Sequence, residues 1–116
     1  MKKSASPAFP MPRKDRPNVL PLEGELDLHV SPTVVASLNM MIEKKPKQVV
    51  VDLSRVTYID SAGLAALIEG LQKVEDYGRN FSLAGLQETV RSIFESSRLD
   101  LVFRNFPDVD AALAAA

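Results

Sequence analysis

The chain has 116 residues, a length typical of a single domain. Its hydrophobic share of 46% and charged share of 25% lie near the averages of globular proteins, which excludes collagen-like and wholly disordered chains. The chain has no cysteine and one histidine, which excludes a disulfide scaffold, a thiolate metal site and a multi-histidine zinc site. A net charge of -1 and an aromatic share of 6% disfavour a nucleic-acid platform.

The charge is distributed unevenly along the chain. Residues 1–16 contain five basic side chains and one acidic side chain, whereas the remainder contains nine basic and fourteen acidic side chains. Four of the eight prolines lie within residues 1–18, which we call the opening segment, and they exclude a regular helix there. We therefore expect residues 1–18 to be a flexible, basic, proline-rich tail and residues 19–116 to be one folded domain. Proline interrupts the apolar stretch that a signal peptide needs, and no apolar run predicts a membrane span.

The first predicted elements are a strand and a helix. Alternating leucines predict a strand over residues 19–26, and Pro21 within it indicates an edge position or a late start, because proline cannot donate to a ladder. Ser31 and Pro32 predict the start of a helix with Ser31 as its N-cap, and Pro46 ends that helix. The predicted apolar face of the helix comprises Val34, Val35, Leu38, Met41 and Ile42.

The centre of the chain predicts two buried strands with a helix between them. Residues 48–53 (QVVVDL) form a β-branched run, typical of a strand buried on both faces, and residues 56–59 form a second short apolar stretch. A helix follows from Ser61, and Gly78 suits a left-handed cap at its end. Residues 81–84 predict the third buried strand. The predicted inward face of the helix comprises Leu64, Leu67, Ile68, Leu71 and Val74.

The last part of the chain predicts two helices around a short strand. The helices are expected over residues 86–97 and 107–115, and the strand over residues 101–103. Strand and helix thus alternate four times, with connections of a length suited to parallel crossovers. The sequence therefore predicts an α/β domain with a mostly parallel or mixed sheet of four to five strands and about four helices.

A candidate site lies where the apolar stretch at 56–59 gives way to a helix. In open α/β sheets, ligand and modification sites gather at this edge. Ser61 falls at or next to the helix N-cap, and the simpler interpretation is structural: Ser61 caps the helix and Gly63 permits close packing. A functional interpretation stays open, because a phosphate on Ser61 would face free backbone N–H groups and the positive end of the helix dipole.

Other chemistries have weaker support in the sequence. Ser61 is not in a G-x-S-x-G elbow, and the five glycines form no phosphate-binding loop. A serine triad would need His29, which we expect to lie on a surface or in a loop. Asp52 and Asp60 are a conceivable carboxylate pair, but nothing marks them as metal ligands.

Three sequence blocks carry a family resemblance. They are LEGELD at residues 22–27, VVVDL at residues 49–53 and YIDSAGL at residues 58–64, and LAGL at residues 83–86 fits as well. At this spacing the blocks resemble the STAS domain family (sulphate transporter and anti-sigma factor antagonist), over nearly the whole chain from residue 19 to residue 115. G-E-L-D combined with D-S-x-G-L is much more specific than either piece alone. The resemblance implies a STAS fold.

The resemblance also implies a function. It indicates a cytoplasmic bacterial partner-switching protein, similar to single-domain anti-sigma factor antagonists, with no catalytic activity and no cofactor or metal. Ser61 would be the phosphoacceptor. The implied partners are a serine-kinase anti-sigma factor of the histidine-kinase-like ATPase type and a PP2C-type phosphatase, with no direct contact to nucleic acid. The implied partner-binding residues are Asp27, Asp60, Ser61, Ala62, Gly63 and Leu64.

Two other hypotheses remain open at this point. In the first, the chain is a non-switching STAS subunit of a larger transport or signalling-scaffold complex, and Ser61 is only a cap. In the second, it is an enzyme or nucleotide-binding protein, although it lacks a phosphate loop. The chain also departs from the family at one place. Members usually have a strand before the G-E-L-D strand, where this chain has its proline-rich segment.

Overall fold

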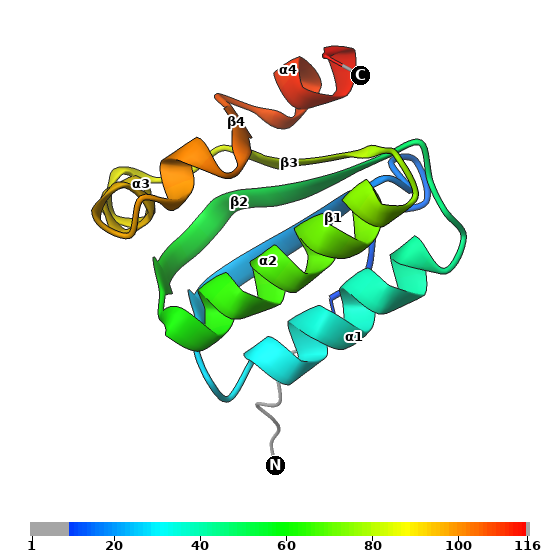
Figure 1. Ribbon diagram of the computed structural model, residues 1–116. Helices are drawn as coiled ribbons and strands as arrows, with labels where there is room; N and C mark the ends of the chain where they lie inside the picture. The colour runs from blue at the N-terminus through cyan, green and yellow to red at the C-terminus, as the bar shows by residue number, and fades with distance from the viewer. Residues whose placement is uncertain (1–9, 116) are drawn as a thin grey trace.

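The computed structural model describes residues 10–115, so what the sequence predicts for residues 1–9 and Ala116 lies outside the described residues. Four parallel strands form one sheet in the order β1-β2-β3-β4 (Figure 1). The strands are β1 (Val19–Leu26), β2 (Gln48–Ile59), β3 (Asn80–Ala84) and β4 (Arg104–Phe106). The helices are α1 (Ser31–Ile42), α2 (Ser61–Asp76), α3 (Glu88–Ser96), the short 3-10 helix η1 (Leu99–Leu101) and α4 (Val109–Ala114). The predicted α/β architecture is confirmed.

The main core lies on one face of the sheet, under α1, α2 and α3. Alternate strand residues point to this face, because successive side chains of a strand face opposite sides of a sheet. Leu20, Val51 and Leu83 are fully buried there, together with apolar side chains from the three helices. The chain returns to the same face after each of the first three strands because parallel crossovers share one hand. Figure 1 shows α1 and α2 lying side by side on one face of the sheet, roughly along the strand direction.

A smaller cluster on the opposite face is covered by α4. Val19, Val50 and Ala84 point to this side of the sheet and pack around Ala112 of α4. Figure 1 shows α4 on the side of the sheet away from α1 and α2. Among the described residues, none of the helices combines the length and the apolar character that a membrane crossing requires.

Strand β2 is a single strand of 12 residues, where the sequence predicts two separate apolar stretches. Its first part lies between β1 and β3, and the part beyond Asp52 pairs with β1 alone. Ser54 and Arg55 are exposed in that second part, so the apolar pattern is interrupted although the strand continues. Strand β1 lies at the edge of the sheet, which agrees with the edge position that Pro21 indicates.

The prediction of a strand over residues 101–103 is wrong. Residues Leu99–Leu101 form η1, and β4 begins only at Arg104. Leu101 and Val102 are apolar, but they are 78% and 49% exposed and are not buried in a sheet. Arg98 has a positive φ of 63°, which turns the chain before η1. Phe103 is the residue of this run that is buried, and it packs against Phe94 with ring centroids 5.6 Å apart.

The prediction that Ser31 is the N-cap of the first helix is also wrong. Ser31 is the first residue of α1, and the capping position is held by Val30, whose side chain makes no capping hydrogen bond. Thr33 supplies a local bond instead, because its hydroxyl donates to the carbonyl of Val30 at 2.7 Å. Pro32 lies in the first turn as predicted, where its missing N–H costs no intrahelical bond.

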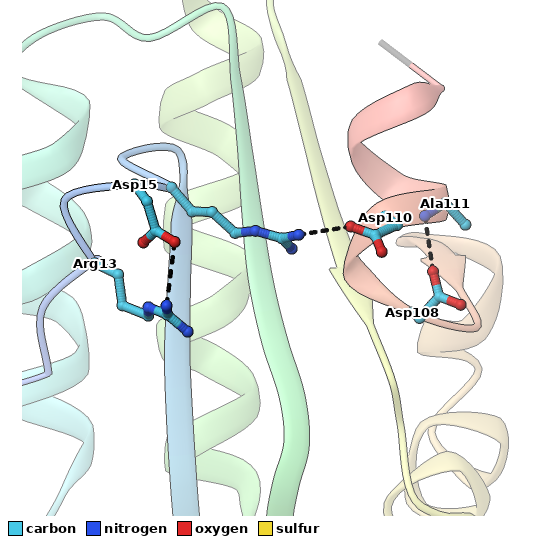
Figure 2. Close-up of polar contacts among 6 residues, drawn as sticks. Arg13, Asp15, Asp108, Asp110 and Ala111 are labelled. Carbon is cyan, nitrogen blue, oxygen red and sulfur yellow. Dashed lines mark hydrogen bonds and ion pairs between the residues drawn. The ribbon is translucent and has the colours of Figure 1, made fainter.

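The described part of the opening segment, residues 10–18, contacts the folded elements at both of its ends. The Ser37 hydroxyl of α1 donates to the carbonyl of Pro10 at 2.6 Å. Arg16 Nη2 pairs with Asp110 Oδ1 of α4 at 2.7 Å (Figure 2). The segment therefore joins α1 on one face of the sheet to α4 on the other.

Candidate functional site

The N-terminus of α2 is capped by Asp60, where β2 ends. One carboxylate oxygen of Asp60, Oδ1, accepts a hydrogen bond from the backbone N–H of Gly63 at 3.0 Å. The backbone of Asp60 is extended, as in most N-cap residues, and the prediction that Ser61 caps this helix is therefore wrong. Ser61 is the first residue of the helix itself.

The second carboxylate oxygen of Asp60 reaches the loop between β1 and α1. Asp60 Oδ2 accepts the backbone N–H of Leu28 at 3.1 Å, and the N–H of Asp60 donates to the carbonyl of Leu26 at 3.1 Å. Asp27, which lies between Leu26 and Leu28, accepts hydrogen bonds within the loop itself. Its Oδ1 accepts the backbone N–H groups of His29 at 3.0 Å and of Val30 at 3.2 Å. The two aspartates thus fix one loop against the start of one helix.

Gly63 allows α2 to begin directly against β1. A Cβ added at this position would collide with the carbonyl oxygen of Leu26 and would lie 2.7 Å from Cγ1 of Ile59. The neighbours include backbone and a fully buried side chain, so they have little room to move. The sequence-based interpretation that Gly63 serves close packing is confirmed by this geometry.

Ser61 is exposed at the start of α2. Its hydroxyl makes no hydrogen bond to the residues that the structure describes. The first backbone N–H groups of a helix have no intrahelical acceptor, and those of Ser61 and Ala62 are left without one within residues 10–115. A group attached to the Ser61 oxygen would therefore stand in solvent, next to free donors and the positive end of the helix dipole.

The residues that the resemblance implies as partner-binding all lie at this edge, but they differ in exposure. Ser61 is exposed, and Asp27, Asp60 and Ala62 are half-buried. Gly63 and Leu64 are buried beneath them, and Leu64 belongs to the main core. The two buried residues therefore support the surface from below, and the accessible chemistry is that of a serine, two carboxylates and a small apolar side chain.

Two large exposed side chains at the same edge were missed as site candidates. Leu28 is 69% exposed in the loop whose N–H groups bind the two aspartates, and Tyr58 is 46% exposed near the end of β2. The sequence carried no signal for Leu28, because an apolar residue in a loop can be either packed or exposed. Large exposed apolar side chains beside polar ones are typical of protein-binding surfaces.

The structure does not bring together the other chemical candidates. Asp52 and Asp60 are separated by eight residues of extended strand, a span of about 26 Å at the rise of a β-strand. The Asp52 carboxylate instead accepts the N–H of Ser54 at 2.9 Å. His29 lies exposed in the β1–α1 loop, as expected. Within residues 10–115, no three histidine or acidic side chains gather in a way that would hold a metal ion.

Comparison with known proteins identifies the family to which this chain belongs. The family model described as STAS domain matches residues 8–112, and the chain belongs to the STAS domain family. Several of the proteins to which the chain is similar are named as anti-sigma factor antagonists. The chain is 30% identical over 83 residues to the anti-sigma-B factor antagonist of Staphylococcus epidermidis, covering 71% of this chain and 77% of the relative.

Two further comparisons agree with this assignment. The chain is 30% identical over 94 residues to BtrV of Bordetella bronchiseptica, named as an anti-sigma factor antagonist, with 81% of each protein covered. The crystal structure of an anti-sigma factor antagonist from Mycobacterium paratuberculosis superposes with a TM-score of 0.77 at 27% identity, covering 84% of this chain and 82% of that one. The resemblance that the D-S-x-G-L and G-E-L-D blocks carry is thus confirmed.

Proposed function

We propose that this protein is an anti-sigma factor antagonist whose binding to a serine-kinase anti-sigma factor is controlled by phosphorylation of Ser61. The proposal rests on one observation at the start of α2: Asp60 caps the helix, and Ser61 next to it is exposed. Capping therefore gives no reason for a serine at this position. The names of the relatives support the class of regulator.

The local electrostatics favour attachment of phosphate without a change of fold. A phosphoserine carries roughly -1.5 to -2 charges at neutral pH and is stabilised at a helix N-terminus by the free N–H groups and the dipole. At Ser61 these are the N–H groups at the first turn of α2. The oxygens would remain in solvent, so the unbound protein tolerates the added charge.

The same charge opposes a protein interface. A partner that covers Ser61 would remove water from the phosphate while the carboxylates of Asp27 and Asp60 lie at the same edge. Like charges that lose their water repel strongly, and desolvation of the phosphate adds a further cost. The unphosphorylated edge, which carries the exposed Leu28 and the small Ala62, permits close apolar contact instead. Phosphorylation thus releases the partner.

The proposal assigns partners and a compartment. A kinase of the histidine-kinase-like ATPase type phosphorylates Ser61 and is itself the partner that the unmodified protein binds. A PP2C-type phosphatase restores binding, and all three proteins work in the cytoplasm. The chain itself performs no catalysis and needs no cofactor in this scheme.

Phosphorylation in vitro tests the acceptor directly. The purified protein is incubated with ATP and a candidate kinase of this type, and the phosphate is located by mass spectrometry. We expect one phosphate on Ser61 of the wild type and none on Ser61→Ala. Ser92→Ala, which removes an exposed serine of α3, is the matched control and should be phosphorylated as the wild type is. Full phosphorylation of Ser61→Ala would contradict the proposal.

The same reagents separate a switch from a non-switching subunit. Retention of the kinase on immobilised protein is compared for the wild type, Ser61→Asp and Ser92→Asp. A switch predicts that Ser61→Asp alone loses the kinase. Equal retention by all three proteins would favour the alternative of a STAS subunit in a larger transport or scaffold complex.

A further inference from the structure

A groove lies between the opening segment and the second half of α1, far from Ser61. Helix α1 starts at the carboxyl ends of the strands, where Ser61 lies. It runs back toward the amino ends of the strands, as a crossover between parallel strands must. The groove, with a volume of about 380 Å³, lies at this far end of α1. We call it the methionine groove. The residues that line it include Met11, Lys14, Met40, Met41, Lys44 and Pro46.

The wall of the methionine groove formed by the opening segment is fixed to the domain. Ser37, which is buried in α1, donates to the carbonyl of Pro10 at one end of that wall. At the other end the carbonyl of Asn18 accepts the N–H of Val50 at 2.9 Å, and Arg16 pairs with Asp110. A ligand would therefore enter a groove that is already formed, and its binding would not require this wall to be ordered.

The surface of the methionine groove is apolar and adaptable. Met11 and Met40 are 54% and 47% exposed, and the nearly buried Met41 lies with them. Unbranched thioether side chains adjust to apolar partners of varied shape, and proteins that bind several targets use them at their binding surfaces. Large exposed apolar side chains that share one hollow indicate an interaction site more strongly than the same side chains scattered singly.

The charge around the methionine groove is positive. Within residues 10–115, no carboxylate lies at ion-pair distance from Lys14 or Lys44, whereas Arg13 is paired with Asp15 at 3.1 Å (Figure 2). Glu43 also lines the groove, and no basic side chain of residues 10–115 lies at ion-pair distance from it. Lys45 and Lys47 follow directly in sequence and are exposed, as are the two groove lysines. This basic rim contrasts with the acidic balance of residues 17–116.

We infer that the methionine groove binds a protein segment that carries apolar side chains flanked by acidic ones, and that it does so independently of Ser61. The apolar lining fits the side chains of such a segment, and the unpaired lysines of the rim complement its carboxylates. The concave shape favours an inserted segment over a flat lipid surface, and the lining residues within the described part of the chain include no aromatic ring on which a nucleic-acid base would stack.

The methionines make the inference testable by NMR. The chain has four methionines, and Met11, Met40 and Met41 line the groove. Protein with isotope-labelled methionine methyl groups is titrated with a short synthetic helical peptide that has leucines on one face and glutamates on the other. We expect the three groove methyl signals to shift. A peptide with lysines in place of the glutamates should produce no shift at the same concentrations, and equal shifts would overturn the inference.

Charge-reversal variants locate the contact. Fluorescence anisotropy with the labelled acidic peptide should give about fivefold weaker binding for Lys44→Glu and for Lys14→Glu. Arg91→Glu, at an exposed position of α3, is the matched control and should bind as the wild type does, as should Ser61→Asp. Circular dichroism checks that each variant is folded. Equal weakening by Lys44→Glu and Arg91→Glu would overturn the inference, because it would show general charge attraction.

The same methionine methyl signals distinguish three other possible occupants of the methionine groove. Groove shifts that depend on protein concentration without peptide would assign the groove to a second copy of this chain. Shifts produced by phosphatidylserine vesicles but not by the acidic peptide would assign it to an anionic membrane surface. Peptide binding that appears only after deletion of residues 1–9 would assign it to the chain's own N-terminus. Each of these results would overturn the inference.

Discussion

Asp60 and Leu28 are 32 residues apart in the chain, yet the carboxylate of Asp60 accepts the backbone N–H of Leu28 at 3.1 Å. The other oxygen of the same carboxylate caps α2 through Gly63. One side chain therefore fixes both the start of a helix and the loop that carries Asp27. This arrangement makes the shape of the proposed partner surface depend on Asp60, although Ser61 is the residue proposed to be modified.

Replacement of Asp60 should destabilise the protein more than the loss of a simple cap. Asp60→Ala removes one capping bond and one loop bond, which together should cost about 2 kcal/mol of unfolding free energy, measured by urea denaturation. Asp108→Ala is the matched control, because Asp108 caps α4 through a single bond to Ala111 at 2.8 Å (Figure 2). Its expected cost is about 1 kcal/mol. Equal losses in the two variants would show that the bond to Leu28 contributes nothing.

Substitution of Gly63 should be costly because its neighbours are rigid. Gly63→Ala places a methyl group against the Leu26 carbonyl and the Ile59 side chain, and we expect a loss of about 2–3 kcal/mol. Gly70→Ala is the comparison. Its Cβ would have side-chain atoms of Leu38 and Phe81 as its nearest neighbours, at 3.0 and 3.1 Å, and none of these three nearest atoms belongs to the backbone, so the expected loss is smaller. Thermal unfolding ranks the two variants, and the reverse order would contradict this account of the α2–β1 contact.

Negative charge at Ser61 should act oppositely on stability and on binding. Ser61→Asp places a carboxylate in the first turn of α2, where the dipole stabilises it by about 0.3–1 kcal/mol. Unfolding free energy should therefore stay equal or rise while kinase binding falls. Ser92→Asp, in the middle of α3, lacks this dipole effect and should leave kinase binding unchanged. A large loss of stability in Ser61→Asp would mean that binding falls through unfolding and not through charge in the interface.

The hydroxyl of Tyr77 should make stability depend on alkaline pH. Burial raises the pKa of Tyr77, and the neighbouring Arg79 offsets part of this rise. The hydroxyl also donates to the carbonyl of Pro46 at 3.0 Å, a bond that needs the protonated form. Because the folded-state pKa exceeds the unfolded value of about 10, the contribution is fully present below that pH and is lost as the pH rises through the folded-state pKa.

The variant Tyr77→Phe isolates this effect. The difference in unfolding free energy between the wild type and Tyr77→Phe should be constant near neutral pH and should shrink above about pH 10. Tyr58→Phe, at an exposed position, is the control and should keep the pH dependence of the wild type. A wild-type advantage that grows above pH 10 would contradict the assigned direction.

The ion pair between Arg16 and Asp110 should be weak and sensitive to salt. Both side chains are substantially exposed, at 40% and 80%, so a double-mutant cycle with Arg16→Ala and Asp110→Ala should give a coupling of about 0.2–1 kcal/mol at low salt. High salt should remove most of it. A coupling that persists in 1 M salt (a Debye length of about 3 Å) would indicate a buried bond.

The sequence predicts the element order well because apolar periodicity reports burial directly. The runs at residues 48–53 and 81–84 lie in the two central strands, which are covered on both faces, and nearly every position in them is buried. The same logic fails after Arg98, where Leu101 and Val102 are apolar but exposed and the strand begins later. Periodicity alone does not distinguish an apolar residue in the core from one left at the surface.

The sequence predicts where the candidate site lies, but it does not predict the internal geometry of that place. Residue types place a capping residue at the start of α2, yet both Asp60 and Ser61 suit that position. The choice depends on the loop after β1, because Asp60 can also reach Leu28 from the capping position. This contact joins segments distant in sequence, so no local pattern reveals it. For the same reason the exposure of Leu28 became evident only in three dimensions.

The strand order β1-β2-β3-β4 follows the chain without a reversal, and this has a consequence for assembly of the fold. Each strand finds its neighbour in the next strand along the chain, so the sheet can grow from the N-terminus as the chain leaves the ribosome. Arg16 and Asp110, in contrast, are 94 positions apart in the chain. Their contact can form only after the last helix has been synthesised, which makes it a closing step. Of the contacts described for residues 10–18, the pair with α4 is therefore the last that can form.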